Sequence, residues 1–157
     1  VLGTFAAGSP EYTAMLLAGG AATCGCAAHM IGYAVMSFRE NKVGGLIAQG
    51  LGTSMLQIPN IMRHPQSLLP PIIASAIVGP LSTCVFMLKC GSSGGGMGTS
   101  GLVGVFDLIK NIGDGGVLYC MGIALCMFII PAIVCFFCSE FMRKKGWLTS
   151  ECLKLDL

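Results

Sequence analysis

Two short segments of this chain contain nearly the same set of glycine and hydroxyl residues. Residues 50–56 have the sequence GLGTSML and residues 96–102 have the sequence GMGTSGL, so both match the pattern G-x-G-T-S-x-L. Glycine permits unusual backbone angles, and Thr and Ser add hydroxyl groups that suit a polyhydroxylated ligand. The two segments are therefore candidate parts of one binding site.

Polar side chains near these segments extend the candidate site. Gln57 and Asn60 are three residues apart, so on a short helix they face the same way. A chain with 23 glycines can also produce such a repeat by chance, and Thr and Ser often only hydrogen-bond to a neighbouring helix. The predicted binding residues are Thr53, Ser54, Gln57, Asn60, Thr99 and Ser100, with Gln49, His29 and Asp107 as further candidates.

Two of these further candidates are ionisable, and each has a second interpretation. His29 lies in the apolar sequence CAAHMIG, where it either serves the function or stays neutral and bonds to a neighbouring helix. Asp107, in GVFDLIK, either accepts a hydrogen bond from a ligand hydroxyl or caps its helix or pairs with Lys110 three residues later. The sequence leaves these alternatives open.

The sequence shows no catalytic or cofactor-binding motif. GMGTSG at residues 96–101 matches the dinucleotide-binding pattern G-x-G-x-x-G, but it follows an apolar stretch instead of a strand. Met121 also stands about 20 residues further on, where that motif needs an acid. No Ser/His/Asp set, metal-ligand cluster or pair of carboxylates occurs at a plausible spacing. We expect no catalytic residue, metal or cofactor in this chain.

The composition is typical of a membrane protein. Hydrophobic residues make up 54% of the 157 residues and charged residues only 10%, whereas soluble domains carry roughly a quarter charged residues. The formal net charge of +2 is too small to indicate nucleic-acid binding. The nine cysteines lie mostly in apolar runs, so we expect reduced thiols that pack as small hydrophobic residues.

Three uncharged stretches are long enough to cross a bilayer, which takes about 20 apolar residues. They are residues 12–38, 68–88 and 116–138. Residues 43–62 are also uncharged, but their glycines and polar side chains favour a segment that enters the membrane and is shielded by protein. The sequence therefore predicts an all-α integral membrane protein with about three transmembrane helices and two glycine-rich re-entrant segments, residues 43–62 and 91–109.

The distribution of basic residues predicts the topology. If residues 43–62 do not cross, seven of the nine Lys and Arg residues lie on one side of the membrane, and the positive-inside tendency favours that arrangement. The tail, residues 140–157, is then cytoplasmic. The two repeated segments enter from opposite sides, and such inverted, glycine-interrupted segments often mark the substrate site of a transporter.

The residues carry a family resemblance as well. The sequence GLIAQGLGTSMLQIPNIMRHPQSLLPPIIASAIVGPLSTCVF, followed by GGGMGTSGLVGVFDLI, resembles the membrane EIIC family of the phosphoenolpyruvate-dependent sugar phosphotransferase system. Within it, the chain is most similar to a branch with members described as toxin-gene regulators. The closing segment RKKGWLTSECLKLDL resembles the end of that branch.

The resemblance implies a helical membrane protein of the bacterial plasma membrane, usually homodimeric, that binds and translocates a sugar. A separate EIIB subunit phosphorylates the sugar, and nothing in this chain resembles an EIIA or EIIB domain. Because the family's chains are longer, residues 1–157 are expected to form one membrane domain that is the C-terminal part of a larger one. The alternative is a membrane sensor or regulator that keeps the EIIC-like fold without transport.

Overall fold

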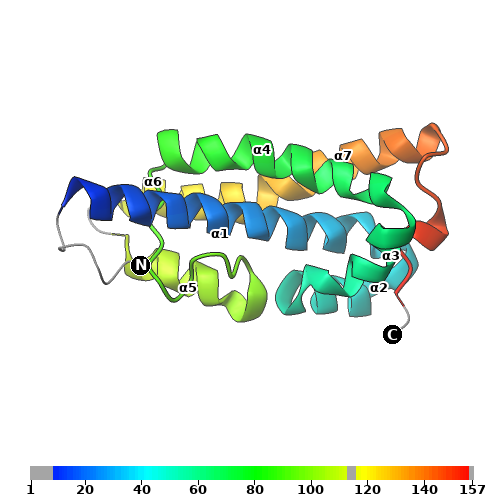
Figure 1. Cartoon of the computed structure of the whole chain (residues 1–157), viewed down its shortest axis with the longest axis horizontal. Helices are drawn as coiled ribbons and strands as arrows, with labels where there is room; N and C mark the ends of the chain where they lie inside the picture. The colour runs from blue at the N-terminus through cyan, green and yellow to red at the C-terminus, as the bar shows by residue number, and fades with distance from the viewer. Residues whose placement is uncertain (1–8, 113–115, 156–157) are drawn as a thin grey trace.

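Three long apolar helical segments run side by side through the molecule (Figure 1). The computed structural model describes residues 9–112 and 116–155. The first segment is α1 (Pro10–Met36), and the second is α4 (Leu69–Cys84), which a 3-10 turn, Pro65–Leu68, precedes. The third joins α6 (Gly116–Ala124) and α7 (Ile130–Lys144) through a π-helical turn, Leu125–Ile129.

All regular structure in the described residues is helical, which confirms the predicted fold class. Each of the three segments is long and apolar enough to cross a membrane. Ser9 caps the start of α1, because its side chain accepts a hydrogen bond from Tyr12 N–H at 3.1 Å. Pro10, the first helical residue, has no backbone N–H and so leaves no donor without a partner there. The first eight residues, residues 113–115 and the last two residues of the predicted tail lie outside the described part of the chain.

The core follows α1 along its length in two groups of buried side chains. One surrounds Cys24 and Ala27 and includes Tyr119 and Met127 from the third segment. The other surrounds Tyr33 and includes Leu153 from the tail. Small residues allow α1 to approach its neighbours closely, as helices in membranes commonly do. A Cβ atom on Gly20, for example, would collide with the carbonyl oxygen of Leu88.

The first broken segment is a hairpin that returns to the end of the bundle from which it starts. It consists of α2 (Phe38–Ile47), a π-helical turn (Ala48–Gly52), a 3-10 turn (Ser54–Gln57) and α3 (Ile58–Arg63). Asn41 in α2 and Asn60 in α3 both donate to tail carbonyl groups, at 2.7 and 2.8 Å. Both limbs therefore meet the C-terminal tail at one end of the molecule.

The second broken segment is a hairpin at the opposite end. It runs through a loop, residues 85–99, and a short 3-10 turn (Ser100–Leu102) into α5 (Val103–Lys110). Cys90 N–H donates to Leu16 O at 3.0 Å, and Gly91 N–H donates to the Asp107 carboxylate at 2.6 Å. The start and end of this hairpin are thus joined beside the N-terminal half of α1, and α5 faces α2 and α3 below α1 in Figure 1.

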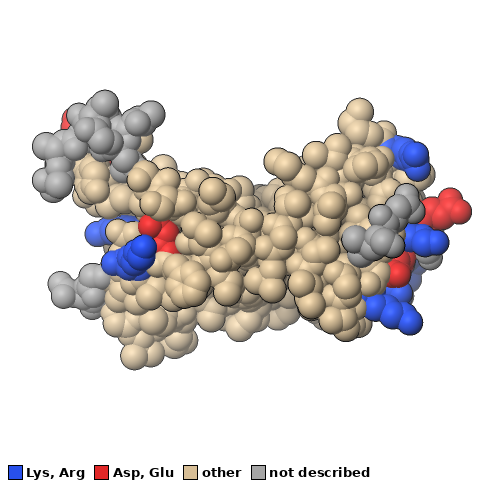
Figure 2. Space-filling view, turned by 90° about the horizontal axis from the view of Figure 1, so that it is seen from below, with Lys and Arg blue, Asp and Glu red and all other residues tan. Residues whose placement is uncertain are grey.

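Charged side chains gather at the two ends of the molecule, and an uncharged band separates them in the view of Figure 2. Two ion pairs tie α2 to the end of α7: Arg39–Glu140 at 2.6 Å and Glu40–Arg143 at 2.7 Å. An uncharged belt with charged ends is the arrangement that a lipid bilayer requires. This chain is therefore built as a multi-pass membrane protein.

The close contact of α1 with the second hairpin yields a first prediction. Gly20→Ala places a methyl group against the Leu88 carbonyl oxygen, and such overpacking costs about 1–3 kcal/mol. Gly25→Ala in the same helix meets only the Cβ atom of Ser75, at 4.0 Å, so it should only gain the better helix propensity of alanine. In detergent, Gly20→Ala should lower the melting temperature and Gly25→Ala should not. Equal melting temperatures would contradict the close approach.

Candidate functional site

The two repeated segments contact each other directly in the structure. The Thr99 hydroxyl donates to the Gly50 carbonyl oxygen at 2.6 Å, and the Ser100 hydroxyl donates to the Gly52 carbonyl oxygen at 3.0 Å. The hydroxyls of the second repeat thus bind the glycine carbonyls of the first. The tips of the two hairpins, which start at opposite ends of the bundle, therefore meet beside α1.

Local backbone geometry explains why these carbonyl groups are available. The π-helical turn ends within the first repeat, at Gly52, and the next residue, Thr53, has an extended backbone with φ −158° and ψ 140°. Carbonyl groups at the end of a helical segment have no partner within it. Hydroxyl groups of the second repeat supply those partners: Thr99 for the carbonyl group of the buried Gly50 and Ser100 for that of the exposed Gly52.

The second repeat reaches this position because glycine lets its backbone lie directly on α1. Gly98 has φ +59°, and a Cβ atom there would stand 2.8 Å from the backbone nitrogen of Ala27. Thr23 of α1 holds the loop, since its hydroxyl accepts from Gly96 N–H at 3.3 Å and lies within donating distance, 3.1 Å, of the Gly94 carbonyl oxygen. The loop is therefore seated on one face of α1.

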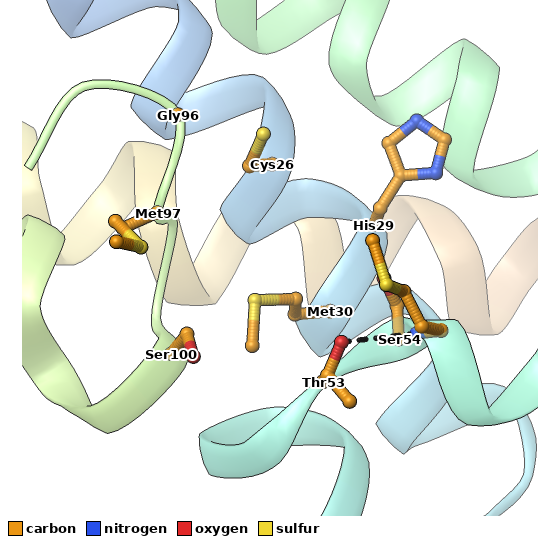
Figure 3. A pocket seen from close by; sticks show the side chains of 9 residues that line it. Cys26, His29, Met30, Thr53, Ser54, Gly96, Met97 and Ser100 are labelled. Atoms are coloured by element: carbon orange, nitrogen blue, oxygen red, sulfur yellow. Dashed lines mark hydrogen bonds between the residues drawn. The ribbon is translucent and has the colours of Figure 1, made fainter.

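A pocket of about 330 Å³ opens beside α1 where the two hairpins meet (Figure 3). Its walls come from α1, the first repeat and the loop of the second repeat. Four of the predicted site residues line it: His29, Thr53, Ser54 and Ser100. The remaining lining residues are Cys26, Met30, Met55, Gly96 and Met97. Met55, Gly96 and Met97 belong to the two repeats but were not named individually. Sequence reasoning missed Cys26 and Met30, although Cys26, His29 and Met30 have the spacing of one helix face.

The pocket offers uncharged polar groups and no ionic side chain. The Ser54 hydroxyl and the His29 ring form no hydrogen bond with any described residue, so both can bind a ligand. Thr53 accepts from Met55 N–H at 3.2 Å, and Ser100 keeps acceptor capacity while it donates to Gly52. Among the described residues, no Asp, Glu, Lys or Arg lines the pocket. This arrangement can bind hydroxyl groups but holds no acid–base pair for catalysis.

Two other predicted residues have partners within the protein. Thr99 is fully buried and bonded to Gly50. Asp107 is also buried, and its carboxylate accepts from Gly91 N–H at 2.6 Å and from the Cys90 thiol at 3.2 Å. Burial raises the pKa of the Cys90 thiol to about 11, so this thiol stays protonated and can donate. Asp107 therefore closes the base of the second hairpin.

The three predicted amide residues form a separate network at the tail end of the bundle. Gln49 donates to the Ser37 hydroxyl at 2.7 Å, and Gln57 donates to the Gln49 side-chain oxygen at 3.1 Å. Asn60 donates to the Gln57 side-chain oxygen at 2.8 Å. Gln49 and Gln57 are fully buried. None of the three lines the pocket, and their amide groups already bind protein partners.

The contact between the repeats yields a second prediction. Thr99→Val keeps the shape of the side chain but leaves the buried Gly50 carbonyl group without its donor, which costs about 1–3 kcal/mol. Thr99→Ser keeps the hydroxyl and should lose less. Thermal unfolding of the purified protein in detergent should rank wild type above Thr99→Ser, and Thr99→Ser above Thr99→Val. Equal stability of Thr99→Val and wild type would show that this hydrogen bond contributes nothing.

Comparison with known proteins identifies the family to which this arrangement belongs. The family described as "Phosphotransferase system, EIIC" matches residues 10–155, which includes all three long helical segments and both hairpins. Neither the curated proteins nor the solved structures that were compared contain a match. The family match confirms the resemblance noted in the sequence. The chain belongs to the EIIC family of the phosphotransferase system.

Proposed function

We propose that this chain is the membrane-embedded part of a sugar phosphotransferase system that binds and translocates the sugar. The observation that carries the proposal is the uncharged pocket, with three hydroxyl groups and His29 among its lining residues, at the meeting point of two broken hairpins from opposite ends of the bundle. Membership of the EIIC family supports it. Broken helical segments that meet within a membrane bundle are a recurrent way to build a substrate site.

The pocket residues fall into two groups, those that hydrogen-bond to the sugar and those that contact its apolar parts. Ser54, Thr53, Ser100 and His29 present groups that can hydrogen-bond to sugar hydroxyls, while the side chains of Met30 and Met97 cover apolar parts of the sugar ring. The other predicted residues do not touch the sugar but support the residues that do. Thr99 joins the two repeats, and Asp107 anchors the base of the second hairpin. Gln49, Gln57 and Asn60 hold the first hairpin.

The charge distribution supports an orientation with the tail in the cytoplasm of a bacterium. The end that carries the tail holds seven basic residues, and the opposite end holds two, Lys89 and Lys110. A partner EIIB subunit would then phosphorylate the sugar from the tail side, and a homodimer is the proposed assembly. The seven are Arg39, Lys42, Arg63, Arg143, Lys144, Lys145 and Lys154.

The proposal predicts that loss of one pocket hydroxyl weakens sugar uptake. Labelled sugars are offered to cells that express the full-length protein, with and without a working phosphotransfer chain. Ser54→Ala should raise the KM for the transported sugar about threefold to tenfold, the effect of one hydrogen bond. Ser75→Ala is the matched control, because the Ser75 hydroxyl donates only to Ile72 O in its own helix, at 2.9 Å.

The same experiment separates transport from regulation. Uptake that requires phosphotransfer and weakens in Ser54→Ala but not in Ser75→Ala supports the permease. If well-inserted protein takes up none of the sugars, the permease proposal fails and a membrane regulator with the same fold is favoured.

A further inference from the structure

The C-terminal tail folds back over the first hairpin and is buried there. Gly146, with φ +73°, turns the chain after α7, and Trp147 N–H donates to Met142 O at 3.0 Å. The tail then runs beside α3 and α2 in Figure 1. Cys152 is 1% exposed and Leu153 is fully buried. We use the name strap for residues 149–155.

The strap binds both limbs of the first hairpin through its backbone. Leu153 O accepts from the side-chain amides of Asn41 at 2.7 Å and Gln57 at 3.1 Å, and Lys154 O accepts from Asn60 at 2.8 Å. Leu155 N–H donates back to the Asn41 side-chain oxygen at 2.8 Å. These partners come from α2, from the 3-10 turn and from α3. The strap therefore holds both limbs of the hairpin together at the end away from its tip.

This binding reaches the pocket through one short element. Gln57 ends the 3-10 turn whose first residue, Ser54, lines the pocket. Because each hydrogen of the Gln57 amide has its own acceptor, Gln49 on one side and Leu153 on the other, the end of that turn is fixed in orientation. The network continues from Gln49 to Ser37, where α1 gives way to α2.

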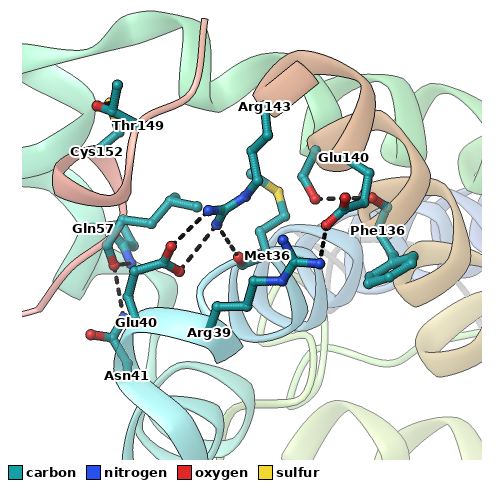
Figure 4. A network of polar contacts seen from close by, with 12 residues as sticks. Met36, Arg39, Glu40, Asn41, Gln57, Phe136, Glu140, Arg143, Thr149 and Cys152 are labelled. Atoms are coloured by element: carbon teal, nitrogen blue, oxygen red, sulfur yellow. Dashed lines mark hydrogen bonds and ion pairs between the residues drawn. The ribbon is translucent and has the colours of Figure 1, made fainter. Parts of the chain in front are cut away.

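Ion pairs hold the same end of the bundle and set the position of the strap. The Arg143 guanidinium binds Glu40 at 2.7 and 3.1 Å and donates to Met36 O at 3.0 Å (Figure 4). Both side chains are mostly buried, with 15% and 6% exposed. The end of α7, from which the strap departs, is therefore fixed against the start of α2.

We infer that the strap positions the pocket: by holding Asn41, Gln57 and Asn60, it fixes the 3-10 turn that presents Ser54. Asn41, Gln57 and Asn60 are positioning residues, and the strap carbonyls are their partners. Release of the strap therefore loosens the Ser54 wall of the pocket. The part of this inference that concerns sugar rests on the proposed function, and the part that concerns the strap and Ser54 does not.

The first test uses Cys152, a native thiol that the strap buries. Purified full-length protein is treated with a maleimide, and labelling of Cys152 is followed by mass spectrometry of its peptide. Asn41→Ala and Asn60→Ala each remove hydrogen bonds to the strap and should speed this labelling roughly fivefold to tenfold. Deletion of residues 153–157, which removes the accepting carbonyls, should do the same.

Asn111→Ala is the matched control. It removes an asparagine amide that donates to a backbone carbonyl, Asp107 O, at 2.7 Å, but in the second hairpin. Labelling of Cys152 should stay at the wild-type rate in this variant. If Asn41→Ala, Asn60→Ala and the deletion all leave the Cys152 rate unchanged, the strap is not held as inferred and the proposal is overturned.

The second test asks whether the strap acts on the pocket wall. The thiol introduced by Ser54→Cys is labelled in the wild-type background and together with Asn60→Ala, Asn41→Ala or Asn111→Ala. Its rate should change several-fold with Asn60→Ala and Asn41→Ala and stay constant with Asn111→Ala. Faster labelling of Cys152 with an unchanged rate at position 54 would overturn the positioning role, because the strap would then only cover the end of the bundle.

Sugar transport supplies a third readout that separates this inference from the proposed function. If the wild type takes up a sugar, Asn60→Ala should raise its KM several-fold while Asn111→Ala does not. An unchanged KM beside a changed rate at position 54 would overturn the link to sugar. If the wild type takes up no sugar, the proposed function fails, while the two labelling tests still decide the role of the strap.

Discussion

The structure depends on the contact between the two repeated segments, in which hydroxyls of one repeat bind carbonyl groups of the other. A helix that is broken inside a membrane exposes backbone groups that water cannot reach, and each unpaired group costs several kcal/mol. Thr99 removes this cost for the buried Gly50, and Ser100 holds the carbonyl group of Gly52 at the exposed edge of the same junction. Two interrupted hairpins can therefore meet beside α1, and the space at their junction becomes a pocket lined by both hydroxyl and apolar side chains.

Glycine makes this contact sterically possible. The second repeat must lie on α1 to reach the first, and Gly98 approaches Ala27 so closely that a side chain would not fit. On the facing surface, Thr23 is the one buried hydroxyl that holds the loop in place. The G-x-G-T-S pattern thus combines two needs: glycines set the path of the backbone, and the hydroxyls that follow satisfy what the broken backbone leaves unpaired.

Much of the fold could be predicted from sequence because the bilayer imposes simple rules on length and charge. The three long apolar segments and the two interrupted ones follow from those rules, and three hydroxyl residues predicted from the repeats, Thr53, Ser54 and Ser100, line the pocket. The surroundings of Gln49, Gln57 and Asn60 could not be predicted. Gln57 and Asn60 bind the backbone carbonyl groups of Leu153 and Lys154. Because every residue has a backbone carbonyl group, the sequence does not indicate which of them a side-chain amide will bind.

The division between amides and hydroxyls has a physical reason. A side-chain amide has two donors and a carbonyl acceptor in fixed geometry, so once it is buried it needs several partners and is best satisfied by the protein itself. Gln57 meets this requirement with Gln49, Leu153 and Asn60. A small hydroxyl such as that of Ser54 can rotate toward whatever ligand group arrives. In this chain the amides therefore fix the first hairpin, whereas the Ser54 hydroxyl at its tip forms no hydrogen bond with any described residue.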